Sequence, residues 1–188
     1  MKKLTIGFAA GFMDGFSKAG LETFAQYKVQ LEKMGKGMGF DLVYYPKAVM
    51  TVSEARAIRE DLDAKAVDFL LLFHPAYIVG DNVYELMKTR ARIGLWAIEE
   101  PREEGPMPLA SFVNLCQNMG IAHQMFKADP KKVKWFFGPI DGPLFKPRFE
   151  ITVKALLAVK NLLNARVAQI GKLADGHINH MLDSRDVY

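Results

Sequence analysis

The sequence predicts an α/β fold, namely a doubly wound parallel sheet of the Rossmann-like or flavodoxin-like type with helices on both faces. Short runs rich in β-forming residues alternate with longer stretches of helical periodicity, which is typical of a parallel sheet covered by helices. Several runs are almost continuously apolar, as expected of strands that are buried on both faces. The clearest is Val67–Phe73.

Six runs are candidate strands: Leu4–Phe8, Leu42–Tyr45, Val67–Phe73, Arg92–Ile98, Val133–Phe137 and Arg166–Ile170. The first run follows two lysines, as the apolar part of a signal peptide does. However, it is short, and Asp14 and Lys18 follow at once, so we interpret it as a strand.

Helix signals lie between these runs. Thr51–Glu54 matches the capping-box pattern and predicts a helix that begins there. Glycines 35, 37 and 39 suit the end of a helix over Leu21–Met34, because glycine readily adopts the left-handed conformation of a helix C-cap. A long helix is expected after Pro147, since proline is tolerated in the first helical turn.

A further helix is expected over Leu109–Phe126, with one apolar and one polar side. The apolar side holds Leu109, Phe112, Val113, Cys116, Met119 and His123, and the polar side holds Ser111, Asn114, Gln117 and Asn118. We therefore expect Cys116 and His123 to be buried in the core. A Cys–His nucleophile is not supported, because the cysteine lies in the middle of a helix.

The size of the chain, 188 residues with half of them hydrophobic, allows one substantial core. The Pro/Gly-rich stretch Gly138–Pro147 predicts a boundary between an N-terminal α/β domain, residues 1–145, and residues 146–188, which would begin a second, truncated domain. The single cysteine excludes an intramolecular disulfide and fits a reducing compartment, so a cytoplasmic location is expected.

Charge and hydropathy argue against two classes of partner. The net charge is +4 and the basic residues are scattered, so no nucleic-acid partner is expected. No stretch approaches the roughly 18 uncharged apolar residues of a membrane span, so no membrane partner is expected.

Three segments are candidates for a binding site. The glycines of Gly7–Gly15 fit neither the GxGxxG nor the GxxxxGK[ST] pattern, which leaves a tight turn or a ligand loop. His74 follows the most apolar strand, where it either faces a ligand or caps the end of the strand. His177 and His180 lie near two aspartates, but a solvated loop is favoured over a metal site because no third ligand has a recognisable spacing.

The order of these segments resembles L-fucose/L-arabinose isomerase-like proteins. Arg92–Ile98, the acidic proline-containing turn after it and Pro108–Met119 resemble one part of that family. Leu70–Ala76 resembles the third strand of that family and the loop that follows it, and Gly7–Gly15 resembles the first strand and its loop. Ala165–Gly171 resembles the opening strand of the family's second domain. The resemblance spans the whole chain, with motifs of moderate specificity.

The resemblance implies an aldose–ketose interconversion through an enediol, with a divalent metal, usually Mn²⁺. In that family the metal ligands lie in later domains, so no catalytic or metal residue is assigned here, and the 188-residue chain alone is expected to be inactive. Its implied role is to help form a sugar pocket in a homo-oligomer, through Asp14, His74, Asn114 and Gln117. The alternative is a stand-alone flavodoxin-like module that binds a sugar or another metabolite without catalysis.

Overall fold

Five strands alternate with five helices in the part of the chain that the structure describes. The structure is a computed structural model, and it describes residues 3–125, 133–166, 171 and 176. The elements are β1 (Leu4–Ala10), α1 (Ala19–Met38), β2 (Phe40–Tyr44), α2 (Val52–Ala64), β3 (Phe69–His74), α3 (Gly80–Met87), β4 (Arg92–Ala97), α4 (Ser111–Met125), β5 (Val133–Phe137) and α5 (Lys146–Leu163).

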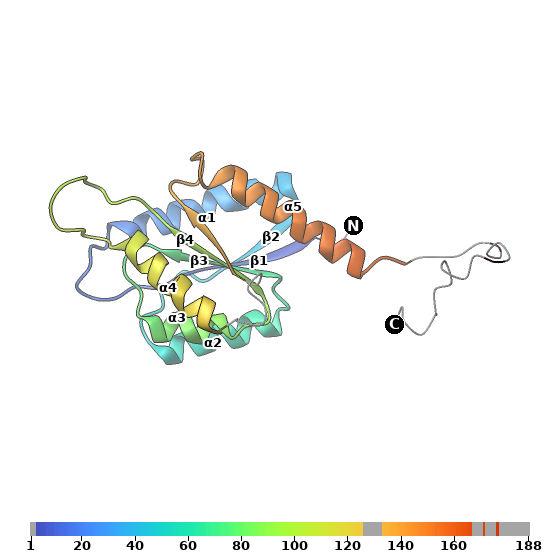
Figure 1. The fold of residues 1–188 in the computed structure, drawn as a ribbon, viewed down its shortest axis with the longest axis horizontal. Coiled ribbons are helices and arrows are strands. Elements are labelled where there is room, and N and C mark those ends of the chain that lie inside the picture. Colours follow the sequence, from blue (N-terminus) through green and yellow to red (C-terminus); the bar gives the residue numbers. More distant parts are fainter. Residues whose placement is uncertain (1–2, 126–132, 167–170, 172–175, 177–188) are drawn as a thin grey trace.

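The sheet confirms the predicted doubly wound fold. All its strand pairs are parallel, and the strand order is β2-β1-β3-β4-β5, the order of flavodoxin-like sheets. Figure 1 shows α1 and α5 on one face, and α2, α3 and α4 on the other. The helices that follow β1 and β3 therefore lie on opposite faces. The loops after these two neighbouring strands flank the switch point, where open α/β sheets commonly bind ligands.

Five of the six predicted strands form this sheet, with bounds shifted by at most two residues. Strand β3 extends one residue past its predicted end and includes His74. The sixth run, Arg166–Ile170, lies outside the described residues except for Arg166.

The core has two layers, because side chains alternate between the two faces of each strand. The layer under α1 and α5 is aromatic and is centred on Phe8, Phe73 and Trp96. The layer under α2, α3 and α4 is mainly aliphatic, with Leu70 and Leu95 among its fully buried members.

The helix ends follow the predicted signals in part. The side chain of Thr51 accepts a hydrogen bond from Glu54 N, and the Glu54 carboxylate accepts one from Thr51 N, which confirms the capping box. Helix α1 continues four residues beyond its predicted end to Met38. Gly39, with φ of 80°, is its left-handed C-cap.

Helix α5 packs on the sheet. Phe149 and Val153 are fully buried in the aromatic layer together with Phe145, which precedes the helix. Helix α5 thus packs against the same sheet as the elements that precede it. The predicted boundary after residue 145, with a second domain over residues 146–188, stays a prediction. None of the helices in the described ranges combines the length and the apolar character needed to cross a bilayer.

Candidate functional site

Three of the four residues predicted on the polar side of α4 face inward, which is the reverse of the sequence prediction, whereas the fourth, Gln117, is exposed as predicted. Ser111, Asn114 and Asn118 are fully buried, whereas Phe112 and Val113 remain nearly half exposed. The prediction was wrong because hydrophobic periodicity ignores the backbone groups of a neighbouring loop. A buried N–H or C=O must find a partner, and here α4 supplies the partners for the loop after β3.

Asn114 provides the main contact between α4 and that loop. Its Oδ1 accepts a hydrogen bond from Ile78 N at 2.9 Å, and its Nδ2 donates to Ile78 O at 3.0 Å. The side-chain amide thus pairs with both backbone groups of one residue, as a neighbouring strand would. Asn114 therefore fixes the path of residues 75–79.

His74 lies at the carboxyl end of β3, as predicted, but it is fully buried. Its Nδ1 is 3.3 Å from Leu72 O, and its Nε2 is 3.1 Å from Asn118 Nδ2. Because a carbonyl oxygen can only accept, Nδ1 carries the proton and Nε2 accepts from Asn118. Of the two sequence interpretations, this geometry fits the histidine that caps a strand end. Burial lowers the pKa of His74 to about 4, so its ring is neutral at neutral pH.

Because His74 is buried, we expect the protein to become less stable as the pH falls below neutral. Its pKa falls from an ordinary 6.5 to about 4 on folding, so between these pH values the unfolded chain binds a proton that the folded chain does not. The free energy of unfolding should therefore fall as the pH is lowered through this window, by up to about 1.4 kcal/mol per pH unit. Urea unfolding of the wild type and His74→Gln at several pH values measures this slope, which should be smaller in the variant by the contribution of His74.

His123→Gln is the matched control, because that histidine is exposed. The control should keep the wild-type slope. Equal slopes in the wild type and His74→Gln would contradict the assignment, and NMR titration of the His74 ring gives an independent reading of its pKa.

Cys116 and His123 are both exposed, so the expectation that they are buried in the core was wrong. Both errors have the same cause, namely that Asn114 and Asn118 and not the predicted apolar residues face the sheet. Once Asn114 and Asn118 face the sheet, residues two or five positions away point to solvent.

The accessible groups near the switch point come from three loops or helices. Asp14 and Phe16 follow β1, Tyr77 follows β3, and Gln117 lies on α4. The rings of Phe16 and Tyr77 are stacked, with their centres 5.3 Å apart and an interplanar angle of 10°. The Tyr77 hydroxyl donates a hydrogen bond to Gln117 Oε1 at 2.6 Å. We refer to Asp14, Phe16, Tyr77 and Gln117 as the carboxyl-end surface.

The loops that carry this surface are tied together. Ser17 N donates a hydrogen bond to Pro108 O at 3.0 Å, which joins the loop after β1 to the loop after β4. The Ser111 hydroxyl donates to His74 O at 2.6 Å and accepts from Ile98 N at 3.0 Å. These contacts hold the carboxyl ends of β1, β3 and β4 in one arrangement.

The predicted site residues thus have two kinds of environment. Asp14 and Gln117 are exposed, whereas His74 and Asn114 lie beneath the surface with partners inside the protein. The sequence analysis missed Phe16, Tyr77, Ser111 and Asn118. Phe16 and Tyr77 could have been found from the sequence, because they are aromatic residues in the loops directly after two apolar strands.

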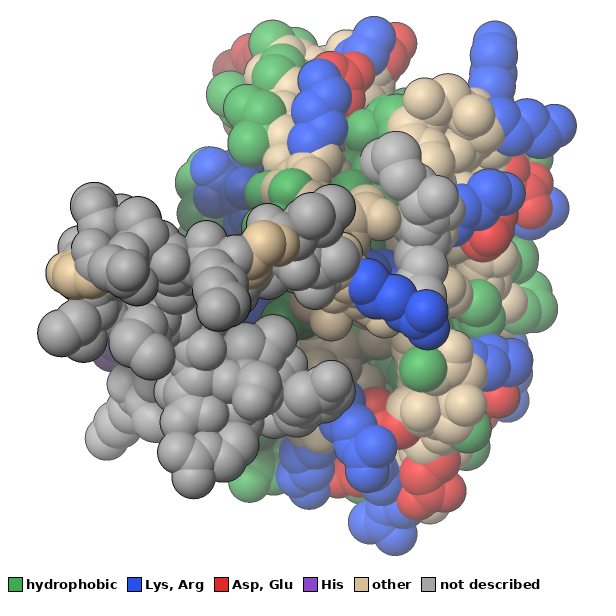
Figure 2. All heavy atoms as spheres, turned by 90° about the vertical axis from the view of Figure 1, so that its right-hand side faces the viewer, with side chains coloured by type: hydrophobic (Ala, Val, Ile, Leu, Met, Phe, Trp, Pro, Cys, Tyr) green, Lys and Arg blue, Asp and Glu red, His purple; other side chains and the backbone are tan. Residues whose placement is uncertain are grey.

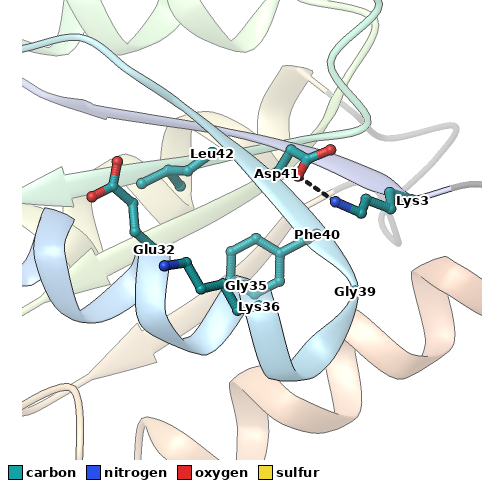
Figure 3. Close-up of a pocket in the computed structure, with 8 residues that line it drawn as sticks. All are labelled: Lys3, Glu32, Gly35, Lys36, Gly39, Phe40, Asp41 and Leu42. Carbon is teal, nitrogen blue, oxygen red and sulfur yellow. Dashed lines mark hydrogen bonds and ion pairs between the residues drawn. The ribbon is translucent and has the colours of Figure 1, made fainter.

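A charged cavity of about 390 Å³ lies at the opposite edge of the sheet, between the end of α1 and the start of β2 (Figure 3). Lys3 and Asp41 point toward each other across it and form an ion pair of 3.0 Å, with side chains 65% and 63% exposed. Exposed pairs of this kind contribute little energy. Because ligands of open α/β sheets bind at the carboxyl ends of strands, we do not place the functional site here.

No group of three or more His, Cys, Asp or Glu side chains that could hold a metal ion occurs among the described residues. His177 and His180 lie outside them.

Comparison with known proteins adds no assignment, since no family model and no curated protein matches the chain.

Proposed function

We propose that this chain is the N-terminal portion of an aldose–ketose sugar isomerase, and that the carboxyl-end surface contributes to its sugar pocket. The observation that carries the proposal is the Phe16–Tyr77 stack with its bond to Gln117, placed beside the switch point of the sheet. Sites of this fold lie at that edge, and binding pockets combine aromatic walls with a few well-placed polar groups.

The surface matches the chemistry of a sugar. The aromatic rings offer an apolar wall for the C–H groups of the ligand. The carboxylate of Asp14 accepts hydrogen bonds from hydroxyls, and the amide of Gln117 both donates and accepts. Tyr77 is held on one side by Phe16 and on the other by Gln117, so little side-chain entropy remains to be lost on binding.

In this proposal His74 and Asn114 position the surface and do not touch the sugar. Asn114 holds Ile78, the residue after Tyr77, by both of its backbone groups. Asn118 donates to His74 Nε2 and to Asn114 Oδ1, so the strand end and the loop share one hydrogen-bond network. The two buried side chains fix where Tyr77 lies.

Isomerisation through an enediol requires an electrophile on the sugar oxygens and a base within reach of the transferred proton. The described residues provide no cluster for a metal, so we place the metal site and the proton-transferring groups in other parts of the protein. The part of the chain described here would bind and orient the sugar and would carry out no chemical step.

The substitution Gln117→Ala tests the proposal. It removes an amide that would bond to the sugar and also orients Tyr77, and one such hydrogen bond contributes about 1 kcal/mol, or roughly fivefold in affinity. Isothermal titration of the chain with L-fucose and L-arabinose should therefore give a dissociation constant at least about fivefold higher for the variant than for the wild type.

Gln124→Ala is the matched control, because this glutamine is also exposed on α4 but lies two turns further along. It should bind both sugars like the wild type. Failure of both sugars to bind the wild-type chain, or equal weakening by both substitutions, would refute the proposal.

A further inference from the structure

A groove rich in cations runs along α5 at the edge where the strands begin. It consists of two adjoining hollows of about 340 and 240 Å³, which share Arg92, Leu156 and Val159. Its charged lining comprises four cations, Arg90, Arg92, Lys134 and Lys160, against the single carboxylate of Asp68, a net charge of +3. Figure 2 shows many lysine and arginine side chains on this side of the molecule, with aspartate and glutamate side chains among them.

The alternation of side chains explains why the groove is cationic. Arg92 is the first residue of β4 and Lys134 the second residue of β5. They share a sheet face with the buried Trp96 and Phe136 further along the same strands. Helix α5 covers the aromatic part of this face. At the strand beginnings the apolar wall of α5 remains accessible, with Val159 44% and Leu163 81% exposed.

The acidic loop after β4 has the opposite character. Residues 99–107 contain four glutamates and one arginine, a net charge of −3, and Met107 is 54% exposed. Glu100 is engaged at the start of α4, where it accepts from Leu109 N and Ser111 N. Glu99, Glu103 and Glu104 are exposed.

Hydrogen bonds within the loop hold it in one conformation. The Arg102 guanidinium donates two hydrogen bonds to Pro106 O, at 3.2 and 2.9 Å. A loop that is ordered before binding loses less entropy when it docks. It protrudes at the carboxyl ends of the strands, and in Figure 1 it lies at the opposite end of the molecule from the end of α5.

We propose that the chain associates head to tail with a second copy of itself, in which the 99–107 loop of one copy docks in the α5 groove of the next. The two surfaces carry equal and opposite net charge, and each also presents an apolar contact, Met107 on the loop and the Val159–Leu163 side of α5 in the groove. Because the two surfaces are different and lie at opposite ends of the molecule, the contact is heterologous. Repeated contacts then produce a closed ring or a filament.

Charge reversal on each side provides the test. Sedimentation velocity of the wild-type chain should show association that increases with protein concentration and weakens when salt is raised from about 0.1 to about 0.5 M. Arg92→Glu with Lys134→Glu should weaken it at least about tenfold, and Glu103→Lys with Glu104→Lys should do the same.

The decisive sample is a mixture of the two double variants. In the groove variant both surfaces are acidic, and in the loop variant both surfaces are cationic because the loop now has more cations than carboxylates. Each variant therefore self-associates poorly but is complementary to the other. The mixture should therefore recover the association of the wild type. Lys154→Glu, an exposed charge change on α5 outside the groove, should leave association unchanged.

A wild-type chain that is monomeric at every concentration would overturn the proposal. Double variants that associate as strongly as the wild type, or a mixture that stays monomeric, would also overturn it. The substitution Val159→Glu adds a second reading at an exposed position, because it should weaken association while circular dichroism shows an unchanged fold.

Discussion

Replacement of Trp96 by alanine should lower the free energy of unfolding by about 3–5 kcal/mol, the largest loss expected for any single truncation in the core. Trp96 is fully buried at the centre of the aromatic layer. Its ring stacks on those of Phe145 and Tyr27, with ring centres 4.0 and 4.7 Å apart. Its Nε1 also donates a hydrogen bond to Gly138 O at 2.9 Å, so truncation leaves both a cavity and a buried acceptor without its donor. Chemical denaturation followed by circular dichroism measures the loss.

Trp135→Ala is the control, because it removes the same side chain from a position that is 40% exposed. Its main partner is the Arg148 guanidinium, 4.3 Å from the centre of the ring, a contact that contributes about 0.5–1 kcal/mol at exposed sites. The loss should therefore stay near 1 kcal/mol or below. Similar losses for the two tryptophan variants would show that the aromatic layer under α1 and α5 is not the principal core.

Gly20→Ala should be the second severe substitution, with an expected loss of about 3 kcal/mol. A Cβ atom at this position would overlap the backbone carbonyl of Pro75, because the start of α1 packs directly on the loop after β3. Alanine favours the helix by about 1 kcal/mol over glycine, but a clash with backbone atoms is not relieved by turning a side chain, so the steric cost prevails. Thermal unfolding gives the sign and size of the change.

Gly37→Ala, in the same helix, should have the opposite effect. Apart from its two chain neighbours and the backbone of the helix itself, no heavy atom lies within 4 Å of a Cβ placed there, so only the helix preference remains. The free energy of unfolding should rise by about 1 kcal/mol. A neutral Gly20→Ala would mean that α1 and residues 75–79 are not in contact, and the proposed arrangement of the carboxyl-end surface would fail with it.

The fold could be predicted from the sequence because its main signals are local. Apolar runs such as Val67–Phe73 identify strands that are buried on both faces, and their alternation with helical stretches specifies a parallel sheet. The capping box at Thr51 and the C-cap at Gly39 depend on a few neighbouring residues, and both occur in the structure. Strand order depends on contacts between distant segments, and these leave no local signal.

The orientation of α4 about its axis could not be predicted from local signals. Periodicity correctly predicted a helix, but the orientation of that helix depends on the backbone groups of Ile78 and the ring of His74, which belong to another element. A polar side chain that completes hydrogen bonds of a buried loop can displace an apolar one such as Phe112 to the surface. Sequence therefore placed His74 and Asn114 at the correct edge of the sheet without indicating their burial.

The accessible part of the site was predicted only in fragments. Asp14 and Gln117 were predicted from the positions that the family resemblance implies for a sugar pocket and from their ability to hydrogen-bond hydroxyls, and their role stays a prediction. The pairing of Phe16 with Tyr77 joins residues 61 positions apart in the numbering, and nothing in either loop predicts it.

The most direct test of sugar binding at the carboxyl-end surface is an NMR titration of the isotopically labelled 188-residue chain with L-fucose and L-arabinose. We expect the largest shifts in the backbone amides of residues 13–17 and 77 and in the side-chain amide of Gln117, with little change at the start of β2, where the charged cavity lies. Shifts confined to Lys3, Lys36 and Asp41, or no shifts with either sugar, would contradict it.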